Sequence, residues 1–204
     1  MNHSTFPKPR AAQKGVFAVE FGLIAIAFFL VLFGIIEVAR VLFLWNSVQE
    51  ITRHAARDAA SADFTNLTTM KAIRNNALFN PSSGVLLFSG NIDESYVTID
   101  YMWLDVSGAM WPVAGGSTPM APATATQNVI NCATNPNQAT CIRFVRVQLC
   151  QPPSTGDACT PVNYTEVVPL LSGLFSSADN PLQLPTSPTV VPVETLGRHS
   201  GNSL

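Results

Sequence analysis

The most prominent feature of the sequence is an uninterrupted apolar stretch near the N-terminus. From Val16 to Ile36 the chain carries a single charged residue, Glu20. A bilayer core about 30 Å thick requires about 20 helical residues, so this pattern predicts a membrane-spanning helix over residues 16–38. A buried helix of a soluble protein would be shorter and more one-sided. A cleaved secretory signal would have a shorter apolar region, followed by a cleavage site with small residues.

The helical pattern continues past the apolar stretch to about residue 61. Apolar and small residues recur there at steps of three and four, which is typical of one face of an amphipathic helix. Small residues toward the end of this face allow another layer to pack close to the helix backbone, so we expect the face to cover a sheet. Its predicted members are Val38, Val41, Leu42, Trp45, Val48, Thr52, Ala55 and Ala59.

The remainder of the chain predicts an α+β head over residues 39–196, in which the long helix packs on an antiparallel β-sheet. A second helix is expected over residues 66–79, with Thr65 or Asn66 as its N-cap and Leu67 on its apolar face. Strands are expected at 85–88, 95–106, 141–150, 162–168 and 189–196; the fourth would form a hairpin with the third, and Pro192 suits an edge strand. Residues 107–128 predict an exposed loop, residues 169–175 a turn of helix, and residues 197–204 a flexible tail.

Charge sets the orientation and excludes one class of partner. Residues 1–15 form a basic leader with Lys8, Arg10 and Lys14 and no acid. Positive charge favours the cytoplasmic side of a membrane, so we expect the N-terminus inside and the head outside. Over the whole chain, 11 basic and 13 acidic residues nearly balance. Without a basic stripe, nucleic acid is not expected as a partner.

The cysteines indicate an oxidising compartment for the head. Cys132, Cys141, Cys150 and Cys159 are evenly spaced along the chain, and four cysteines allow three pairings. Polar, turn-rich segments separate the first pair and the last pair, whereas Cys141 and Cys150 would point to opposite faces of one strand. We therefore expect disulfides Cys132–Cys141 and Cys150–Cys159. A zinc site is the alternative, but the chain has no C-x-x-C motif and no histidine near these cysteines.

Glu20 does not fit a simple anchor. A lone acid deep in a membrane helix costs about 2.5–3.5 kcal/mol on insertion scales and by default marks a function with a named partner. If the chain were cut after Gly15, the new amine on Val16 would lie one helical turn from Glu20. A carboxylate near a helix N-terminus is stabilised by the helix dipole and by a free amine. In an assembly, Glu20 could instead meet the amine of a neighbouring subunit.

The segment around these residues resembles a known class of proteins. Lys14-Gly15 followed by Val16-Phe17-Ala18-Val19-Glu20-Phe21 is similar to the processing site of type IV prepilins. The longer pattern, with GVFAVEFGLIA, GIIEVARVLF and ITRHAARDAA within residues 14–60, resembles the TadE-like pseudopilins of the tight-adherence (Flp, type IVb) pilus system. The resemblance implies that prepilin peptidase removes residues 1–15, between Gly15 and Val16, and that Glu20 and Phe21 act in assembly.

The same resemblance implies a role and partners. Major pilins of this system are much smaller and typically carry Glu-Tyr where this chain has Glu20-Phe21, so a minor pilin or pseudopilin precursor that serves pilus assembly and surface adhesion is expected. The TadF-like sister group has a similar N-terminal pattern. Expected partners are prepilin peptidase, other pilins and pseudopilins, the inner-membrane assembly platform and membrane lipid. The expected location is the bacterial inner membrane, with a periplasmic head, or the extracellular pilus.

Little in the sequence indicates catalysis. The chain has three histidines, of which His3 and His199 lie near the termini, and no nucleophile-elbow, phosphate-loop or dinucleotide motif. We therefore expect no enzyme activity, no cofactor and no metal site. The competing function classes are an unprocessed, single-pass protein with an external binding domain, and a membrane-tethered enzyme.

Overall fold

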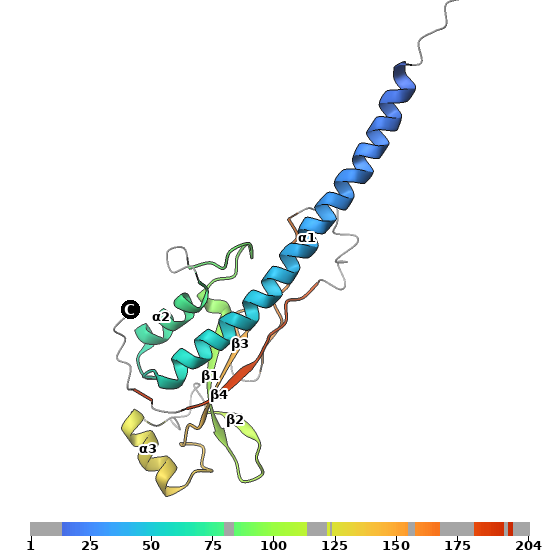
Figure 1. Ribbon diagram of the computed structural model, residues 1–204. Helices are drawn as coiled ribbons and strands as arrows, with labels where there is room; N and C mark the ends of the chain where they lie inside the picture. Colours follow the sequence, from blue (N-terminus) through green and yellow to red (C-terminus); the bar gives the residue numbers. More distant parts are fainter. Residues whose placement is uncertain are drawn as a thin grey trace, which may run out of the picture.

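The computed structural model describes residues 14–79, 84–113, 122, 124–154, 158–167, 182–193 and 196–197. Its longest element is α1 (Lys14–Ser61), a helix of 48 residues whose N-terminal half projects from the head and whose C-terminal half packs on it (Figure 1). A helix of this length spans about 70 Å at 1.5 Å per residue. The chain has no proline within it, which allows the helix to continue unbroken.

The sheet of the head has four antiparallel strands in the order β2-β1-β3-β4. They are β1 (Val97–Leu104), β2 (Met110–Pro112), β3 (Phe144–Leu149) and β4 (Thr189–Pro192). In the central pair, Ile99 lies opposite Val147 and Tyr101 opposite Val145. The predicted α+β class, with a long helix on an antiparallel sheet, is confirmed, and so is the edge position of the last strand.

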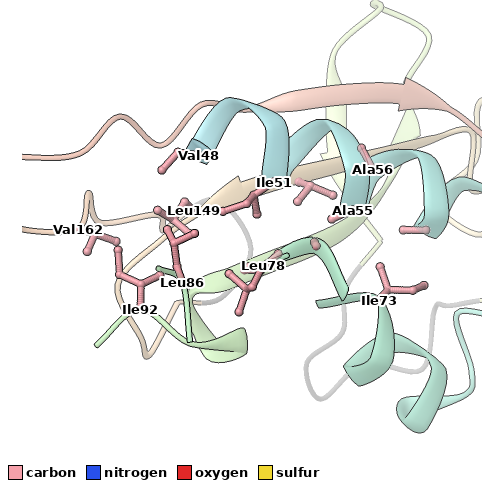
Figure 2. Packing of buried hydrophobic residues seen from close by; sticks show 14 of the residues in the cluster. Val48, Ile51, Ala55, Ala56, Ile73, Leu78, Leu86, Ile92, Leu149 and Val162 are labelled. Atoms are coloured by element: carbon pink, nitrogen blue, oxygen red, sulfur yellow. The ribbon is translucent and has the colours of Figure 1, made fainter. Parts of the chain in front are cut away.

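The core lies between the C-terminal half of α1, the sheet and α2 (Leu67–Ala77). Figure 2 shows Val48, Ile51 and Ala55 of α1 facing Leu149, Leu86 and Leu78. Two side-chain hydrogen bonds join α1 to the sheet. The Tyr101 hydroxyl donates to the Ala59 carbonyl at 3.0 Å, and the hydroxyls of Thr52 and Thr189 are hydrogen-bonded at 2.9 Å. The fully buried alanines of α1 allow the sheet and α2 to come close to its backbone.

The buried stripe of α1 differs in part from the predicted one. Val38, Leu42 and Trp45 were expected on the core face but remain 42%, 53% and 39% exposed. Apolar residues surround the helix in this region, so the helical period alone does not select the face that meets the sheet. The stripe that the structure buries contains Leu44, Val48, Ile51, Thr52, Ala55, Ala56 and Ala59.

The second helix agrees with the prediction, apart from one residue. The Asn66 side chain accepts hydrogen bonds from the backbone amides of Thr68 and Thr69, which caps the helix N-terminus. Met70, Ile73 and Ala77 are buried as expected, whereas Leu67, the first residue of the helix, is 83% exposed.

Three other predictions need correction. Residues 85–88 form a single bridge from Val85 to Asp93 and then a turn, because Ser89 donates both its amide and its hydroxyl back to the Leu86 carbonyl. The expected loop 107–128 contains β2 and the start of α3 (Ala125–Thr134), whose N-terminus Thr124 caps. The described part of 162–168 does not pair with β3; residues 162–164 instead bond with residues 182–184.

The reason for the last error is that β3 already has two partners. Its neighbours β1 and β4 occupy both edges, so the segment that follows it in sequence is displaced to another part of the head. The predicted turn of helix at 169–175 lies outside the described residues, as does all of the predicted tail except Gly197. A short 3-10 turn (Glu94–Tyr96) leads into β1.

Candidate functional site

The predicted processing and assembly residues lie together at the start of α1. Gly15, Val16, Glu20 and Phe21 all belong to its first turns, and all four are exposed, Val16 at 60% and Phe21 at 67%. Among the side chains that the structure describes, none forms an ion pair with Glu20. Glu20 is therefore available to a group outside the described head.

The helix that carries these residues has the properties of a membrane span. Within the described residues, α1 is the one helix long and apolar enough to cross a bilayer, and the head buries none of its most apolar window. Most of its large apolar side chains between Val16 and Ile36 are more than half exposed. Such a surface is consistent with a membrane anchor or a signal segment, since water would penalise it at about 25 cal/mol per Å².

Where the apolar half of α1 meets the head, three side chains form a junction cluster: Glu37, Arg40 and Tyr164. The Glu37 carboxylate is 1% exposed and accepts hydrogen bonds through Oε1 from the Tyr164 hydroxyl, from Arg40 Nη1 at 3.3 Å and from the Val167 amide at 3.2 Å. The guanidinium of Arg40 also lies 4.9 Å from the centre of the Tyr164 ring. A buried carboxylate is tolerated when it is paired in this way.

Arg40 extends the junction cluster to two loops of the head. Its Nη1 donates to the Tyr164 hydroxyl and to the Thr165 carbonyl, both at 2.8 Å, and its Nε donates to the Phe88 carbonyl at 2.7 Å. One side chain therefore fixes the segment around Thr165 and the turn at Phe88 against α1. Arg40 and Glu37 lie one helical turn apart and are neighbours on the same face of α1. Both therefore contact the head at the same point along the helix.

The charges of the junction cluster cancel locally. Burial, and then the hydrogen bond to Glu37, raise the pKa of the Tyr164 phenol above its ordinary value of 10.0. The phenol therefore stays a neutral donor at physiological pH. The acid at position 37 and the base at position 40 form a salt bridge, so this end of the apolar segment presents no free charge from either residue.

The two disulfides bracket β3. Cys132, in α3, bonds to Cys141, and Cys150 bonds to Cys159; these are the two pairs that we expected. Cys141 lies three residues before β3 and Cys150 directly follows it, and both are fully buried. Each bond thus joins one end of the central strand to a neighbouring loop or helix. Closing such short loops typically contributes about 2–3 kcal/mol to stability.

Within the described ranges, no group of three or more His, Cys, Asp or Glu side chains is placed to hold a metal ion. His54 lies on the exposed side of α1, where its Nδ1 is 3.9 Å from Oδ2 of Asp58.

Comparison with known proteins identifies the class of this segment. The model of the TadE-like protein family matches residues 15–57, which confirms the resemblance noted from the sequence. The match covers most of α1, including Gly15, Glu20, Glu37 and Arg40, and it ends before the sheet begins. TadE-like proteins are pilin-type proteins of Tad pili and are generally not enzymes, and residues 15–57 are what this chain shares with them. No curated protein and no solved structure gives a significant match.

Sequence reasoning missed the junction cluster. It treated Glu37 and Arg40 only as part of the EVAR segment that carries the family resemblance. A signal was present, because an acid followed three residues later by a base at the end of a membrane span predicts a neutralised pair. Tyr164 gave no such signal, since its approach to Glu37 depends on how the chain returns to α1 from far along the sequence.

Proposed function

We propose that this protein is the precursor of a minor pilin or pseudopilin of the tight-adherence (Flp, type IVb) pilus. In this proposal, residues 1–15 are a leader that prepilin peptidase removes, residues 16–38 span the inner membrane, and residues 39–196 form the periplasmic head. The protein then takes part in pilus assembly, and so in surface adhesion. It acts by helix-to-helix packing rather than by catalysis.

The observation that carries the proposal is the exposed N-terminal half of α1. The described part of the head buries none of the most apolar window of this half, which falls within the TadE-like match. An apolar helix of this kind has two possible environments, the lipid of a membrane and a bundle of similar helices. A pilin uses both in succession: it is stored in lipid and then moves into a fibre, where neighbouring helices cover it.

Glu20 gives the assembly its register. After cleavage, the amine of Val16 carries a positive charge one turn before Glu20 on the same helix, and the amine of a neighbouring subunit can reach a Glu20 that has no ion pair within the described head. A carboxylate and an amine pair strongly where water is excluded. Opposite charges at fixed positions on two helices favour one axial offset and disfavour the others. Phe21, which is also exposed, would contribute apolar contact area beside the pair.

The partners follow from this sequence of events. Prepilin peptidase acts first, on the bond between Gly15 and Val16. Other pilins and pseudopilins then pack against α1, under the control of the inner-membrane assembly platform. The basic leader keeps the N-terminus on the cytoplasmic side until cleavage.

A pair of glycine variants tests the processing step. Neither Gly15 nor Gly22 has an atom within 4 Å of the position that a Cβ would occupy, so the described structure accommodates a side chain at both sites. Gly15→Leu should block cleavage in cells that contain prepilin peptidase, and Gly22→Leu, the matched control, should be cleaved normally. Mobility on a blot reports the difference.

The alternative is a membrane-anchored protein with an external binding domain that is not processed as a pilin. In that case the two glycine variants and the unmodified protein would all keep residues 1–15. Equal mobility of all three chains, with and without the peptidase, would contradict the pilin proposal.

A further inference from the structure

The turn at Leu87 and Phe88 holds two large apolar side chains out from the head. Leu87 is 53% exposed and Phe88 is 68% exposed. Phe88 adopts a left-handed backbone conformation, with φ of 61°, which is rare for a bulky residue and persists only where the surroundings enforce it. Hydrogen bonds provide that enforcement: the Leu86 amide donates to the Ile92 carbonyl at 2.8 Å, and Arg40 Nε donates to the Phe88 carbonyl.

The turn lies against the outer end of the membrane span. The ring centres of Phe43 and Phe88 are 5.8 Å apart in an edge-to-face arrangement. On another side of α1, about 100–160° around the helix from Phe43, Val38, Leu42 and Trp45 are also exposed. These side chains flank the buried stripe on both sides. We call them the apolar collar: Val38, Leu42, Phe43, Trp45, Leu87 and Phe88.

The exposed surface of α1 changes character directly after the apolar collar. Asn46, Gln49 and Glu50 are exposed polar residues, whereas Glu37 and Arg40 are neutralised in the junction cluster. From Val38, the last residue of the proposed span, to Trp45 the helix rises about 10 Å at 1.5 Å per residue. The hydrocarbon core is about 30 Å thick, and each headgroup layer adds about 5–7 Å. The apolar collar therefore starts at the outer boundary of the hydrocarbon core, and Trp45 lies at the outer edge of the headgroup layer.

We propose that the apolar collar inserts into the outer headgroup layer of the membrane and seats the head on the lipid surface. This inference rests on the membrane anchoring in the proposed function, and it adds a second lipid contact made by the head itself. The occupant is lipid because the apolar collar continues the apolar surface of the span, without a free charge between them. Tryptophan at this level is typical of a membrane interface, where its ring is partly in lipid and its N–H in water.

Contact between the apolar collar and lipid fixes the rotation and tilt of the head. A single helix could rotate about its axis in the bilayer, but the turn at Phe88 contacts lipid on one flank, and Leu42 and Trp45 do so on another. Interfacial aromatic anchors are among the features that set helix tilt. The unassembled protein would therefore present a defined side of its head to the assembly machinery.

Quenching of tryptophan fluorescence tests this proposal on the full-length chain. The protein is placed in vesicles of phosphatidylethanolamine and phosphatidylglycerol that contain phosphatidylcholine brominated near the headgroup end of its acyl chains. Three single-tryptophan proteins are compared: Trp45 alone (W103F/W111F), position 88 alone (F88W in W45F/W103F/W111F), and Trp111 alone (W45F/W103F). Trp111 is the matched control, since it is 48% exposed in β2, at the end of the head away from the span (Figure 1).

We expect the brominated lipid to quench positions 45 and 88 and to leave Trp111 unchanged. Resistance of each protein to alkaline carbonate extraction reports the anchor separately. If positions 45 and 88 are not quenched although the protein resists extraction, the apolar collar proposal is wrong and the anchor stands. Equal quenching at all three positions would also overturn it, since the head would then have no preferred contact. Extraction by carbonate would overturn the anchor and the collar together.

Discussion

Removing the acid of the junction cluster should loosen the head from α1. Glu37→Ala leaves three donors without their acceptor: the Tyr164 hydroxyl, the Val167 amide and one N–H of Arg40. It also leaves the guanidinium of Arg40, whose side chain is 12% exposed, without its carboxylate. The substitution therefore tests whether these contacts hold the turn at Phe88 and the segment around Thr165 in place.

The expected loss of stability is about 3 kcal/mol. Breaking a buried ion pair by removing one partner typically costs about 3–5 kcal/mol. The lower end applies because Arg40 keeps hydrogen bonds to the Thr165 and Phe88 carbonyls and has some access to water. Glu37→Gln should cost less than Glu37→Ala, since an amide oxygen can still accept from Tyr164 while the charge is lost.

Urea unfolding of the full chain in detergent micelles, followed by near-ultraviolet circular dichroism, measures this loss. With a slope of about 2 kcal/mol per M, a loss of about 3 kcal/mol lowers the unfolding midpoint by about 1.5 M. Glu50→Ala is the matched control, because Glu50 is an exposed acid on the same helix. Its free energy of unfolding should change by less than about 0.5 kcal/mol.

The reasoning fails if Glu37→Ala and Glu50→Ala unfold at the same urea concentration as the unmodified chain. That result would mean that Glu37 is solvated in the folded protein and that the junction cluster does not hold the head. A large loss for Glu37→Ala with none for Glu37→Gln would place the stabilisation in the hydrogen bonds rather than in the charge.

Three further predictions concern other parts of the molecule. Glu20→Ala should leave insertion and cleavage intact but reduce piliation and adherence, because an unpaired amine in a water-poor bundle costs about 3–5 kcal/mol; normal pili would show that Glu20 has no part in assembly. Replacing Cys150 and Cys159 by serine should lower the free energy of unfolding by about 2–3 kcal/mol; an unchanged melting temperature would contradict this. Hydrogen bonds, the largest effect being that of the Ser107 hydroxyl, lower the pKa of Asp105 to about 2, so its carboxyl resonance should titrate near that pH. The stability that Asp105 adds, measured against Asp105→Asn, is then fully present above the unfolded-state pKa of about 4 and is lost as the pH falls through 2; a titration midpoint near 4 would rule this out.

The long helix and the edge strand could be predicted because their signals are local. A proline-free apolar stretch followed by a helical period defines α1, and Pro192 disfavours a central strand. The face of α1 that packs on the head could not be chosen from the sequence. Between Val41 and Trp45 every residue is apolar, so the sheet and the loops decide that Leu44 is buried and Leu42 exposed.

Contacts between distant segments account for the other differences. β3 pairs with β1 and β4 rather than with the segment that follows it, and no local pattern reports such a choice. The helix α3 was missed because the glycine-, serine- and proline-rich residues before it suggested a long loop. Its N-cap, Thr124, was a signal that could have been found. The role of Glu20 stays a prediction, which rests on the cost that a lone acid would have in lipid.

The intact mass of the protein extracted from membranes tests the central claim most directly. Cells with and without prepilin peptidase would be compared, with the disulfides left oxidised. The pilin proposal predicts that the chain from peptidase-positive cells lacks residues 1–15 and begins at Val16, whereas the chain from peptidase-negative cells begins at Met1. A chain that begins at Met1 in both cell types would contradict the proposal.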